Sequence, residues 1–569
     1  MRYFPTMIEP LESPPSRKSW LSDLLLLVVV FAALLGPSIG RRALWEPDEG
    51  RYAEIPREMV ATGDYLTPRI NGIKYFEKPP LVYWATAAAI RIAGTSEGAV
   101  RSPIALFALL GGLAVYVAGR RLFGRAAALW SALVLATSPL YLGLGQILSL
   151  DMPVSALLTA SLLAFLLAVR EPPGWNRRLL LWAFYAAAAL AVLSKGLIGV
   201  LIPALVIGAW ILLTRQWRLI PVALAPTGIL VFLAIAAPWH LFASRAHPEF
   251  AWFYFVHEHF QRYLSTVHNR YEPPWYFVPV LLGGLLPWTL FLPQALKSAW
   301  RTDQAERRET LFLALWATIV FGFFSLSDSK LMPYVLPAVP PLALLVGRWL
   351  GNIAQEGRQE TEERSPLRPA LWVFLLLGLI LAAAVSFWPT PPEGTKDHAF
   401  IDLLGGFRPA LAMCFAFIGL APFVIDRLGK CRASLAALVL GNALLFTTLG
   451  ALAPRLDTYR SAKPLAKALM RQLQSGDEVA SYHFYPHTLA YYLGRRITIV
   501  GYTGELEFGT RHDDTRAWVI DDSEFWRRWS GRGRMYVVVN THHRKSLPVQ
   551  LASARVVGEG GLFRVVVNR

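Results

Sequence analysis

The first long hydrophilic stretch of this chain gathers carboxylates, cations and aromatic rings in two short blocks. They are Trp45-Glu-Pro-Asp48-Glu-Gly-Arg51-Tyr52 and Ile73-Lys-Tyr75-Phe-Glu77-Lys78-Pro-Pro80, and both follow an apolar run at 21–40. Asp48 suits a general base or an electrostatic anchor, and capping of the following helix is its alternative role. Lys78 suits a phosphate as a point charge, and a surface salt pair is its alternative role. We take Asp48, rather than Glu49, as the catalytic candidate.

A helix over 49–62, preceded by Asp48, also positions the neighbours of Asp48. Arg51 and Tyr52 follow by three and four residues, which places them on the helical face that carries Asp48. An ion pair with Asp48 or Glu54 is the purely structural role that Arg51 could have instead.

Two more candidates stand at the ends of apolar segments. Asp151 begins one such segment and is either a helix cap or a second acid. Lys195 stands at the tip of a predicted hairpin between the segments 179–194 and 196–214. A lysine that snorkels from the membrane to water is the alternative there.

The segment 240–274 is rich in histidine and aromatic residues. His257 could join Glu77 on a divalent metal such as zinc, although His257-Glu-His259 is not the spacing of zinc proteases. Arg262, five residues after His257, could bind a phosphate. No cofactor follows from the sequence with certainty.

The composition places these candidates in a membrane protein. Of 569 residues, 54% are hydrophobic and 17% are charged, whereas soluble domains carry about 25% charged residues. Runs of about 20 apolar residues, the length that crosses a bilayer, recur along the chain. The stretch 80–94 is too short to span and predicts an interfacial helix. The thirteen predicted spans are 21–40, 101–119, 125–145, 151–169, 179–194, 196–214, 219–239, 275–296, 309–326, 332–350, 369–388, 407–425 and 432–453.

The net charge of +17 follows membrane topology rather than a nucleic-acid partner. With the N-terminus inside, the inner segments hold 22 Lys and Arg, and the outer loops after the first hold 6, as the positive-inside rule requires. The first outer loop, 41–100, departs from this bias. Either an anionic lipid head group that binds there, or a position flat on anionic lipid, would explain the departure.

On this topology the unusual polar residues fall on the outer face, which favours one site for lipid-borne substrates over a path across the bilayer. Residues 454–569 contain β-rich runs at 478–481, 497–500, 535–539 and 562–567, with helical stretches at 464–474 and 523–529 between them. They predict a small extracytoplasmic α/β domain, separate from a membrane domain over 1–453 with outer loops 41–100 and 240–274.

The motifs resemble those of the GT-C glycosyltransferases that use polyprenyl-phosphate sugars. The most similar subfamily is the bacterial aminoarabinose (4-amino-4-deoxy-L-arabinose) lipid A transferases, related to protein O-mannosyltransferases. The resemblance covers the whole chain. It rests on the blocks Asp48–Glu54, Gly63–Arg69, Asn71–Pro80, Ser149–Asp151, Ser194–Gly196 and Ser329–Tyr334.

This resemblance implies a fold of about thirteen transmembrane helices with a C-terminal extracytoplasmic α/β domain, in the bacterial inner membrane with the site facing the periplasm. It implies an undecaprenyl-phosphate-linked sugar as donor, lipid A as acceptor, a monomer, and no nucleic-acid partner. Asp48 would be the essential acid and Asp151 the second acid, and Glu77 and His257 would hold any metal. Donor phosphate would bind to Lys78 and Arg262. The cavity would be lined by Arg51, Tyr52, Tyr75, Lys195 and Tyr334.

Three other functions compete with this one. A related transferase would move another sugar to a protein hydroxyl or to a different glycolipid. A flippase for lipid-linked sugars should show internal repeats and charges at the membrane midplane, and neither is evident in the sequence. A receptor without catalytic activity would use the C-terminal domain for binding.

Overall fold

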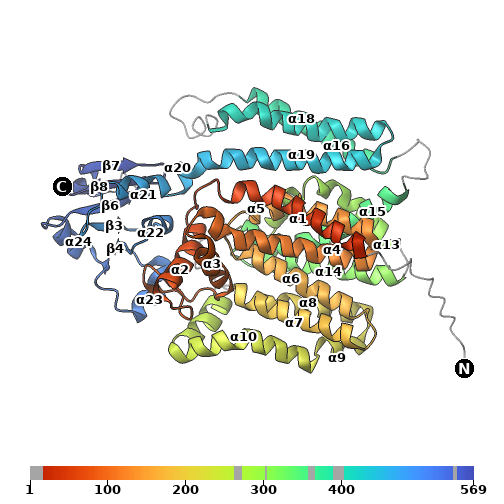
Figure 1. Cartoon of the computed structure of the whole chain (residues 1–569), viewed down its shortest axis with the longest axis horizontal. Helices are drawn as coiled ribbons and strands as arrows, with labels where there is room; N and C mark the ends of the chain where they lie inside the picture. The colour runs from red at the N-terminus through yellow and green to blue at the C-terminus, as the bar shows by residue number, and fades with distance from the viewer. Residues whose placement is uncertain (1–16, 262–271, 302–303, 357–364, 389–402, 542–546) are drawn as a thin grey trace, which may run out of the picture.

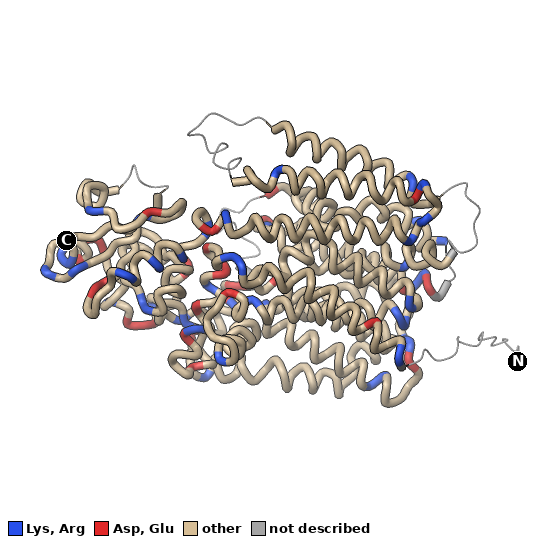
Figure 2. Tube along the Cα trace, turned by 45° about the horizontal axis from the view of Figure 1, so that its top comes forward, with Lys and Arg blue, Asp and Glu red and all other residues tan. Residues whose placement is uncertain are grey.

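The computed structural model describes residues 17–261, 272–301, 304–356, 365–388, 403–541 and 547–569. Within them, a bundle of long helices ends against a domain that contains a sheet and the C-terminus (Figure 1). Charged residues gather at the two ends of the bundle, and the end remote from the sheet carries mainly Lys and Arg (Figure 2). An apolar middle between charged ends is what a bilayer imposes on a multi-pass membrane protein.

The described ranges contain ten helices that are long and apolar enough to cross a membrane, or eleven if one bent pair counts as a span. The two arms of that pair, Phe277–Gly284 and Trp288–Trp300, meet at 97°. The bundle helices are α1 (Arg17–Ile39), α4 (Glu97–Ala136), α5 (Pro139–Leu144), α6 (Asp151–Ala168), α7 (Trp175–Lys195), α8 (Ile198–Thr214), α9 (Ile220–Ala223), α10 (Pro226–Ala246), α12 (Phe277–Gly284), α13 (Leu292–Trp300), α14 (Gln304–Ser325), α15 (Val339–Glu356), α16 (Arg368–Phe387), α18 (Arg408–Arg427) and α19 (Cys431–Leu452).

Local geometry explains why the sequence predicts thirteen spans while ten or eleven of the described helices meet the length and apolarity expected of a span. The spans 101–119 and 125–145 lie in and just beyond α4, which breaks at Gly124, where φ is 86°. The two arms of α4 fold back on each other, since a Cβ added to Gly119 would lie 3.2 Å from Cα of Ala128. Helix α8 has 17 residues, the lower limit of what crosses a bilayer. Thirteen segments result when the arms of α4 count separately and α8 and the bent pair are included.

Helix α6 lies at the centre of the bundle, whereas α1, α10 and α16 lie at its edge. Of the most apolar 18 residues of α6, 83% are buried, but only 22% in each of the three edge helices. Leu21 and Leu25 of α1 are 67% and 65% exposed, because lipid rather than water covers these side chains. Asp151, the first residue of α6, is therefore held by a helix in the well-packed interior of the bundle.

The stretch between α1 and α4 forms a compact platform at the end of the bundle. Its predicted helix is α2 (Asp48–Thr62), which starts one residue earlier than expected and ends at Gly63, a left-handed residue with φ of 76°. A small hairpin of β1 (Arg69–Ile70) and β2 (Ile73–Lys74) follows. The short apolar stretch is the helix α3 (Leu81–Ala93); its interfacial position stays a prediction.

The sheet has the strand order β5-β4-β3-β6-β8-β7. Strands β3, β4, β5 and β6 are parallel, β8 pairs antiparallel with β6, and β7 pairs antiparallel with β8. The four predicted β-rich runs are strands to within one residue. Two strands were missed, because β5 has two residues and β7 is half exposed with a bulge. The elements are α20 (Asp457–Arg460), α21 (Lys463–Met470), β3 (Glu478–Tyr482), α22 (His487–Leu493), β4 (Thr498–Val500), η7 (Gly504–Leu506), α23 (Glu507–His512), β5 (Val519–Ile520), α24 (Asp522–Trp529), β6 (Met535–Asn540), α25 (Val549–Ala552), β7 (Arg555–Glu559) and β8 (Phe563–Val567).

The sheet domain docks closely onto the platform. A Cβ added to Gly50 would lie 2.6 Å from the backbone nitrogen of Thr488 in α22, so only glycine permits this approach of α2 and α22. Asn71 exchanges two hydrogen bonds of 2.9 Å with the backbone of Ile497. These contacts place the loop before α23 beside the residues that follow Pro47.

Candidate functional site

A cavity of about 940 Å³ lies where the platform, the helix bundle and the sheet domain meet. Eleven residues were predicted from the sequence to act in the site, and the structure brings nine of them together around this cavity. The nine are Asp48, Arg51, Tyr52, Glu77, Lys78, Asp151, Lys195, His257 and Tyr334.

The other two predicted residues have different outcomes. Tyr75 does not line the cavity: it is 2% exposed, and its ring centroid lies 6.0 Å from Cζ of Arg51. The prediction that Tyr75 lines the cavity is therefore wrong. The side chain is buried in the core next to Arg51, because the β1–β2 hairpin that precedes it packs it there. Arg262 lies outside the described residues.

Asp48 is the first residue of α2 and pairs with Arg51. Its side chain is 57% exposed, and its Oδ1 accepts a hydrogen bond of 2.8 Å from Nη1 of Arg51. The cap position belongs to Pro47, and no side-chain cap is formed, so the capping role considered for Asp48 is wrong. Tyr52 is buried beside this pair, and its pKa is raised by burial and by the charge of Asp48.

Arg51 is held from the sheet domain as well. Its Nε donates to Oε1 of Glu505 at 3.2 Å, and its Nη2 donates to the other oxygen of that carboxylate. Glu505 also accepts a hydrogen bond from Nε2 of His487, and Nδ1 of His487 lies 3.4 Å from Oε2 of Glu46. Burial lowers the pKa of His487, but the two carboxylates outweigh it and raise the pKa to about 9. The imidazole is therefore a cation at neutral pH.

A second acid–cation pair faces the cavity from the bundle. Nζ of Lys195, the last residue of α7, donates to Oδ1 of Asp151. It also lies 4.5 Å from the ring centroid of Tyr334. The cap position of α6 belongs to Leu150. The two side chains therefore form an ion pair with each other, rather than a helix cap at Asp151 and a lysine that snorkels to water at Lys195.

Lys78 enters the cavity from the segment after β2. Phe76, fully buried, packs its ring against Phe250 with centroids 5.0 Å apart, which anchors the two residues that follow it. Nζ of Lys78 donates to Oε2 of Glu258 at 3.1 Å and to the carbonyl oxygen of Glu77 at 2.9 Å. Glu258 stands on η2 (Trp252–Gln261), so the salt pair of Lys78 crosses the cavity rather than lying on the surface.

Glu77 and His257 line the same cavity, as a shared metal would require. The His257 ring stacks on Phe253 at 5.1 Å, and its Nδ1 lies 3.5 Å from Oε1 of Glu258. In the described part of the chain no group of three or more His, Cys, Asp or Glu is placed to hold a metal ion. Zinc takes four ligands in most protein sites. A metal held by Glu77 and His257 therefore stays a prediction.

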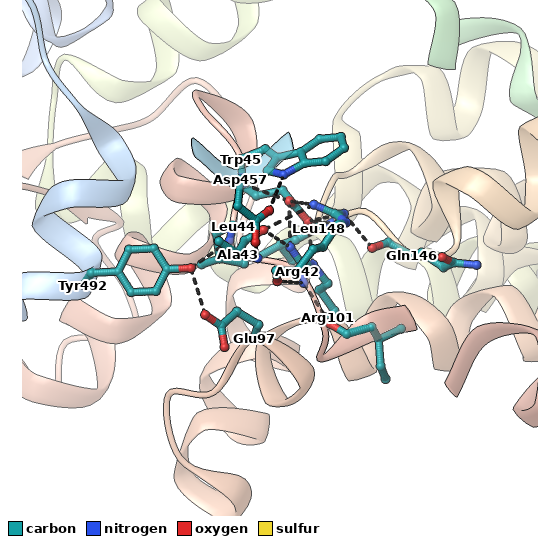
Figure 3. Close-up of polar contacts among 12 residues, drawn as sticks. Arg42, Ala43, Leu44, Trp45, Glu97, Arg101, Gln146, Leu148, Asp457 and Tyr492 are labelled. Atoms are coloured by element: carbon teal, nitrogen blue, oxygen red, sulfur yellow. Dashed lines mark hydrogen bonds and ion pairs between the residues drawn. The ribbon is translucent and has the colours of Figure 1, made fainter. Parts of the chain in front are cut away.

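A buried ion network supports the platform beneath the cavity. Glu49, 2% exposed, accepts hydrogen bonds of 2.8 and 2.9 Å from Nε and Nη2 of Arg101 and pairs with Arg42. Burial raises the pKa of Glu49, but the two guanidinium groups outweigh it and hold the pKa at about 2. Figure 3 shows Arg42 and Arg101 beside the backbone of 43–45, where Asp457 and Tyr492 of the sheet domain also converge.

Sequence reasoning missed the contribution of the sheet domain to this cavity. Tyr502, Glu505 and Phe508 line it from η7, α23 and the loop before them. These residues lie in a region without a recognisable motif, more than 450 residues from Asp48 in sequence. The one available signal was a cluster of Glu and aromatic residues at 502–508, which is too common to indicate a site.

Residues 77–242 match the family described as dolichyl-phosphate-mannose-protein mannosyltransferase, and residues 465–569 match the aminoarabinose transferase C-terminal domain. An undecaprenyl phosphate-alpha-4-amino-4-deoxy-L-arabinose arabinosyl transferase from Erwinia tasmaniensis is 32% identical over 504 residues, which cover 87% of this chain and 88% of the relative.

Solved structures agree with this match. The crystal structure of ArnT from Cupriavidus metallidurans bound to undecaprenyl phosphate has a TM-score of 0.85 and 30% identity, and covers 97% of this chain and 99% of that chain. An oligosaccharyltransferase from Archaeoglobus fulgidus, at 15% identity and a TM-score of 0.51 over 93% of this chain and 70% of that one, shares the fold alone. With relatives of this identity along most of its length, the chain belongs to the aminoarabinose transferases, a family of glycosyltransferases with the GT-C fold.

Proposed function

We propose that this protein transfers 4-amino-4-deoxy-L-arabinose from undecaprenyl phosphate to a phosphate of lipid A, with inversion, at the periplasmic face of the bacterial inner membrane. The activity for which its relatives are named supports the donor and the sugar. The observation that carries the proposal is the pair of acid–cation contacts, Asp48–Arg51 and Asp151–Lys195, which face one cavity at the end of the bundle.

The charge of this cavity suits a cationic amino sugar. Among the described residues that line it are seven carboxylates and four Lys or Arg. An excess of carboxylates attracts the ammonium group of the sugar and stabilises the positive charge that develops at the anomeric carbon during transfer. A neutral sugar would gain only the second of these effects.

In the proposed reaction, a phosphate oxygen of the acceptor attacks the anomeric carbon from the face opposite the donor phosphate. The bond between that carbon and the donor oxygen breaks, and undecaprenyl phosphate leaves with the electron pair. The acceptor phosphate is already ionised at neutral pH, so it needs little base catalysis. Asp48 would orient the acceptor or stabilise the positive charge that develops at the anomeric carbon. The negative charge of the leaving phosphate would be stabilised by Lys78, Lys195 and Arg262.

The test is transfer by the purified full-length protein in lipid nanodiscs, with undecaprenyl-phosphate-linked aminoarabinose as donor and lipid A as acceptor. Mass spectrometry should show lipid A that carries one added aminoarabinose, and the Asp48→Asn protein should give none. Transfer to a protein hydroxyl in place of lipid A would contradict the proposed acceptor; the match to protein mannosyltransferases makes this the outcome to check. We also propose that the protein acts as a monomer and without nucleic acid.

The orientation is testable with an impermeant thiol reagent in cells whose outer membrane is permeabilised. Cysteines placed at Ser244 and Ser523 should react, because we place both residues on the periplasmic side. Native Cys431 begins α19 at the end of the bundle remote from the sheet (Figure 1) and serves as an internal control that should react only after lysis. Protection at both new sites, with labelling of Cys431 before lysis, would reverse the orientation.

A further inference from the structure

The exposed carboxylate of Asp48 depends on one neighbour for its direction. In the described part of the chain, Arg51 is the hydrogen-bond partner of its side chain. A carboxylate that is 57% exposed would otherwise sample several rotamers in water. The orientation of Asp48 is therefore set by whatever fixes Arg51.

Arg51 is fixed mainly from the sheet domain. Its side chain is 12% exposed, and two of its nitrogens, Nε and Nη2, donate to the two oxygens of Glu505. A guanidinium group is rigid and planar, so a bidentate contact at two nitrogens also determines where the third one points. The third nitrogen, Nη1, is the one that donates to Asp48.

Glu505 is itself anchored to the platform. Nε2 of His487 donates to it, and the backbone nitrogen of His487 donates to Oε2 of Glu46 at 3.1 Å. The backbone nitrogen of Thr488 donates to the other oxygen of Glu46 at 2.7 Å. Acidic and basic side chains thus alternate from the platform into the sheet domain and back, in the order Glu46, His487, Glu505, Arg51 and Asp48.

We propose that the sheet domain supplies positioning residues for the transferase site: Glu505 orients Asp48 through Arg51, and His487 holds Glu505 in place. The inference rests on the proposed function for the role of Asp48. It gives the C-terminal domain a part in catalysis without contact between Glu505 and the reacting atoms.

The test compares three variants of the full-length protein in nanodiscs. Glu505→Gln keeps the shape of the side chain but turns an NH₂ group toward the donors of Arg51, so kcat should fall about 100-fold, as expected when a catalytic group is misplaced, with the KM for donor changed less than about threefold. Glu505→Asp keeps the charge and should recover part of the loss. Asp513→Asn is the matched control, because Asp513 joins the same two domains through Arg69 and Lys74 and does not touch Arg51.

Two results would overturn the inference: a kcat of Glu505→Gln within a few-fold of wild type, or an equal loss in Asp513→Asn, which would mean that loosened docking is the cause. The wild-type protein alone decides the proposed function, since it either modifies lipid A or does not. A cryo-EM structure of Glu505→Gln tests the inference independently of any acceptor. The distance from Nη1 of Arg51 to Asp48 should exceed 3.5 Å there, and an unmoved Arg51 would contradict the proposal.

Discussion

Arg101 and Glu49 form a bidentate ion pair, with Nε to Oε1 at 2.8 Å and Nη2 to Oε2 at 2.9 Å. This pair joins the N-terminal part of α4 to the first turn of α2 in the interior of the protein. Arg101 also donates three hydrogen bonds of 2.8 Å to backbone carbonyl oxygens. Its Nη1 donates to Ile39 and Arg42, and its Nη2 donates to Ala43. Glu49 thus holds the platform on the bundle, while its neighbour Asp48 faces the cavity.

We expect Glu49→Gln to destabilise the fold strongly. The amide removes the carboxylate charge that pairs with both Arg101 and Arg42, and a buried ion pair that loses a partner costs roughly 3–5 kcal/mol. Thermal unfolding of the purified protein in detergent, compared with Asp48→Asn, measures the effect. A Glu49→Gln protein that unfolds at the wild-type temperature would show that the network is not needed for stability.

The sequence predicted most of the site because topology sorts ionisable residues to one face. Asp48 and Arg51 are three residues apart on a helix, and Asp151 and Lys195 begin and end apolar segments at the same end of the bundle. Their proximity follows from helix geometry and from the cost of charge inside a membrane. Local patterns were sufficient for these contacts.

The remaining part of the site depends on contacts that no local pattern encodes. Glu505 and His487 reach Arg51 only because the sheet domain docks on α2, and that docking depends on the close approach at Gly50. Tyr75 was assigned to the lining by the family resemblance, which does not show that packing around the β1–β2 hairpin buries this side chain.

Lys78 and its partner Glu258 should have opposite effects on donor binding. In the proposed function Lys78 binds the donor phosphate, and Lys78→Ala would remove that charged contact, worth roughly 1.5–3 kcal/mol, so undecaprenyl phosphate should bind about 10- to 100-fold more weakly. Glu258→Gln removes the carboxylate that competes for Lys78 and should strengthen binding. Titration of the folded proteins with undecaprenyl phosphate gives both dissociation constants. Weakening by Glu258→Gln to the same extent would indicate that the pair acts only in folding.

The contact of His487 with two carboxylates should make stability depend on alkaline pH. The pKa is 6.5 in the reference state and about 9 in the fold, so the imidazolium stabilises the fold fully below pH 6.5 and loses its contribution as the pH rises through about 9. The groups that face it are Glu46, Glu505 and, through Glu505, Arg51. Melting temperatures between pH 7 and 10 should fall more steeply for wild type than for His487→Asn. Parallel curves would contradict the prediction.

The last prediction separates the charge of Asp48 from its shape. Asp48→Asn keeps the side-chain volume and leaves an amide oxygen that can still accept from Nη1 of Arg51. Because the cap position of α2 belongs to Pro47, the fold loses only two charge interactions of an exposed carboxylate, with the helix N-terminus and with Arg51, each worth about 1 kcal/mol or less. The protein should therefore insert, keep a melting temperature close to that of wild type and bind undecaprenyl phosphate. Transfer to lipid A should nevertheless be abolished, because the amide can neither stabilise positive charge at the anomeric carbon nor hold the acceptor as a carboxylate does. If the variant still transfers sugar at a rate near that of wild type, the catalytic role passes to Asp151, whose contact with Lys195 offers the other carboxylate at the same cavity.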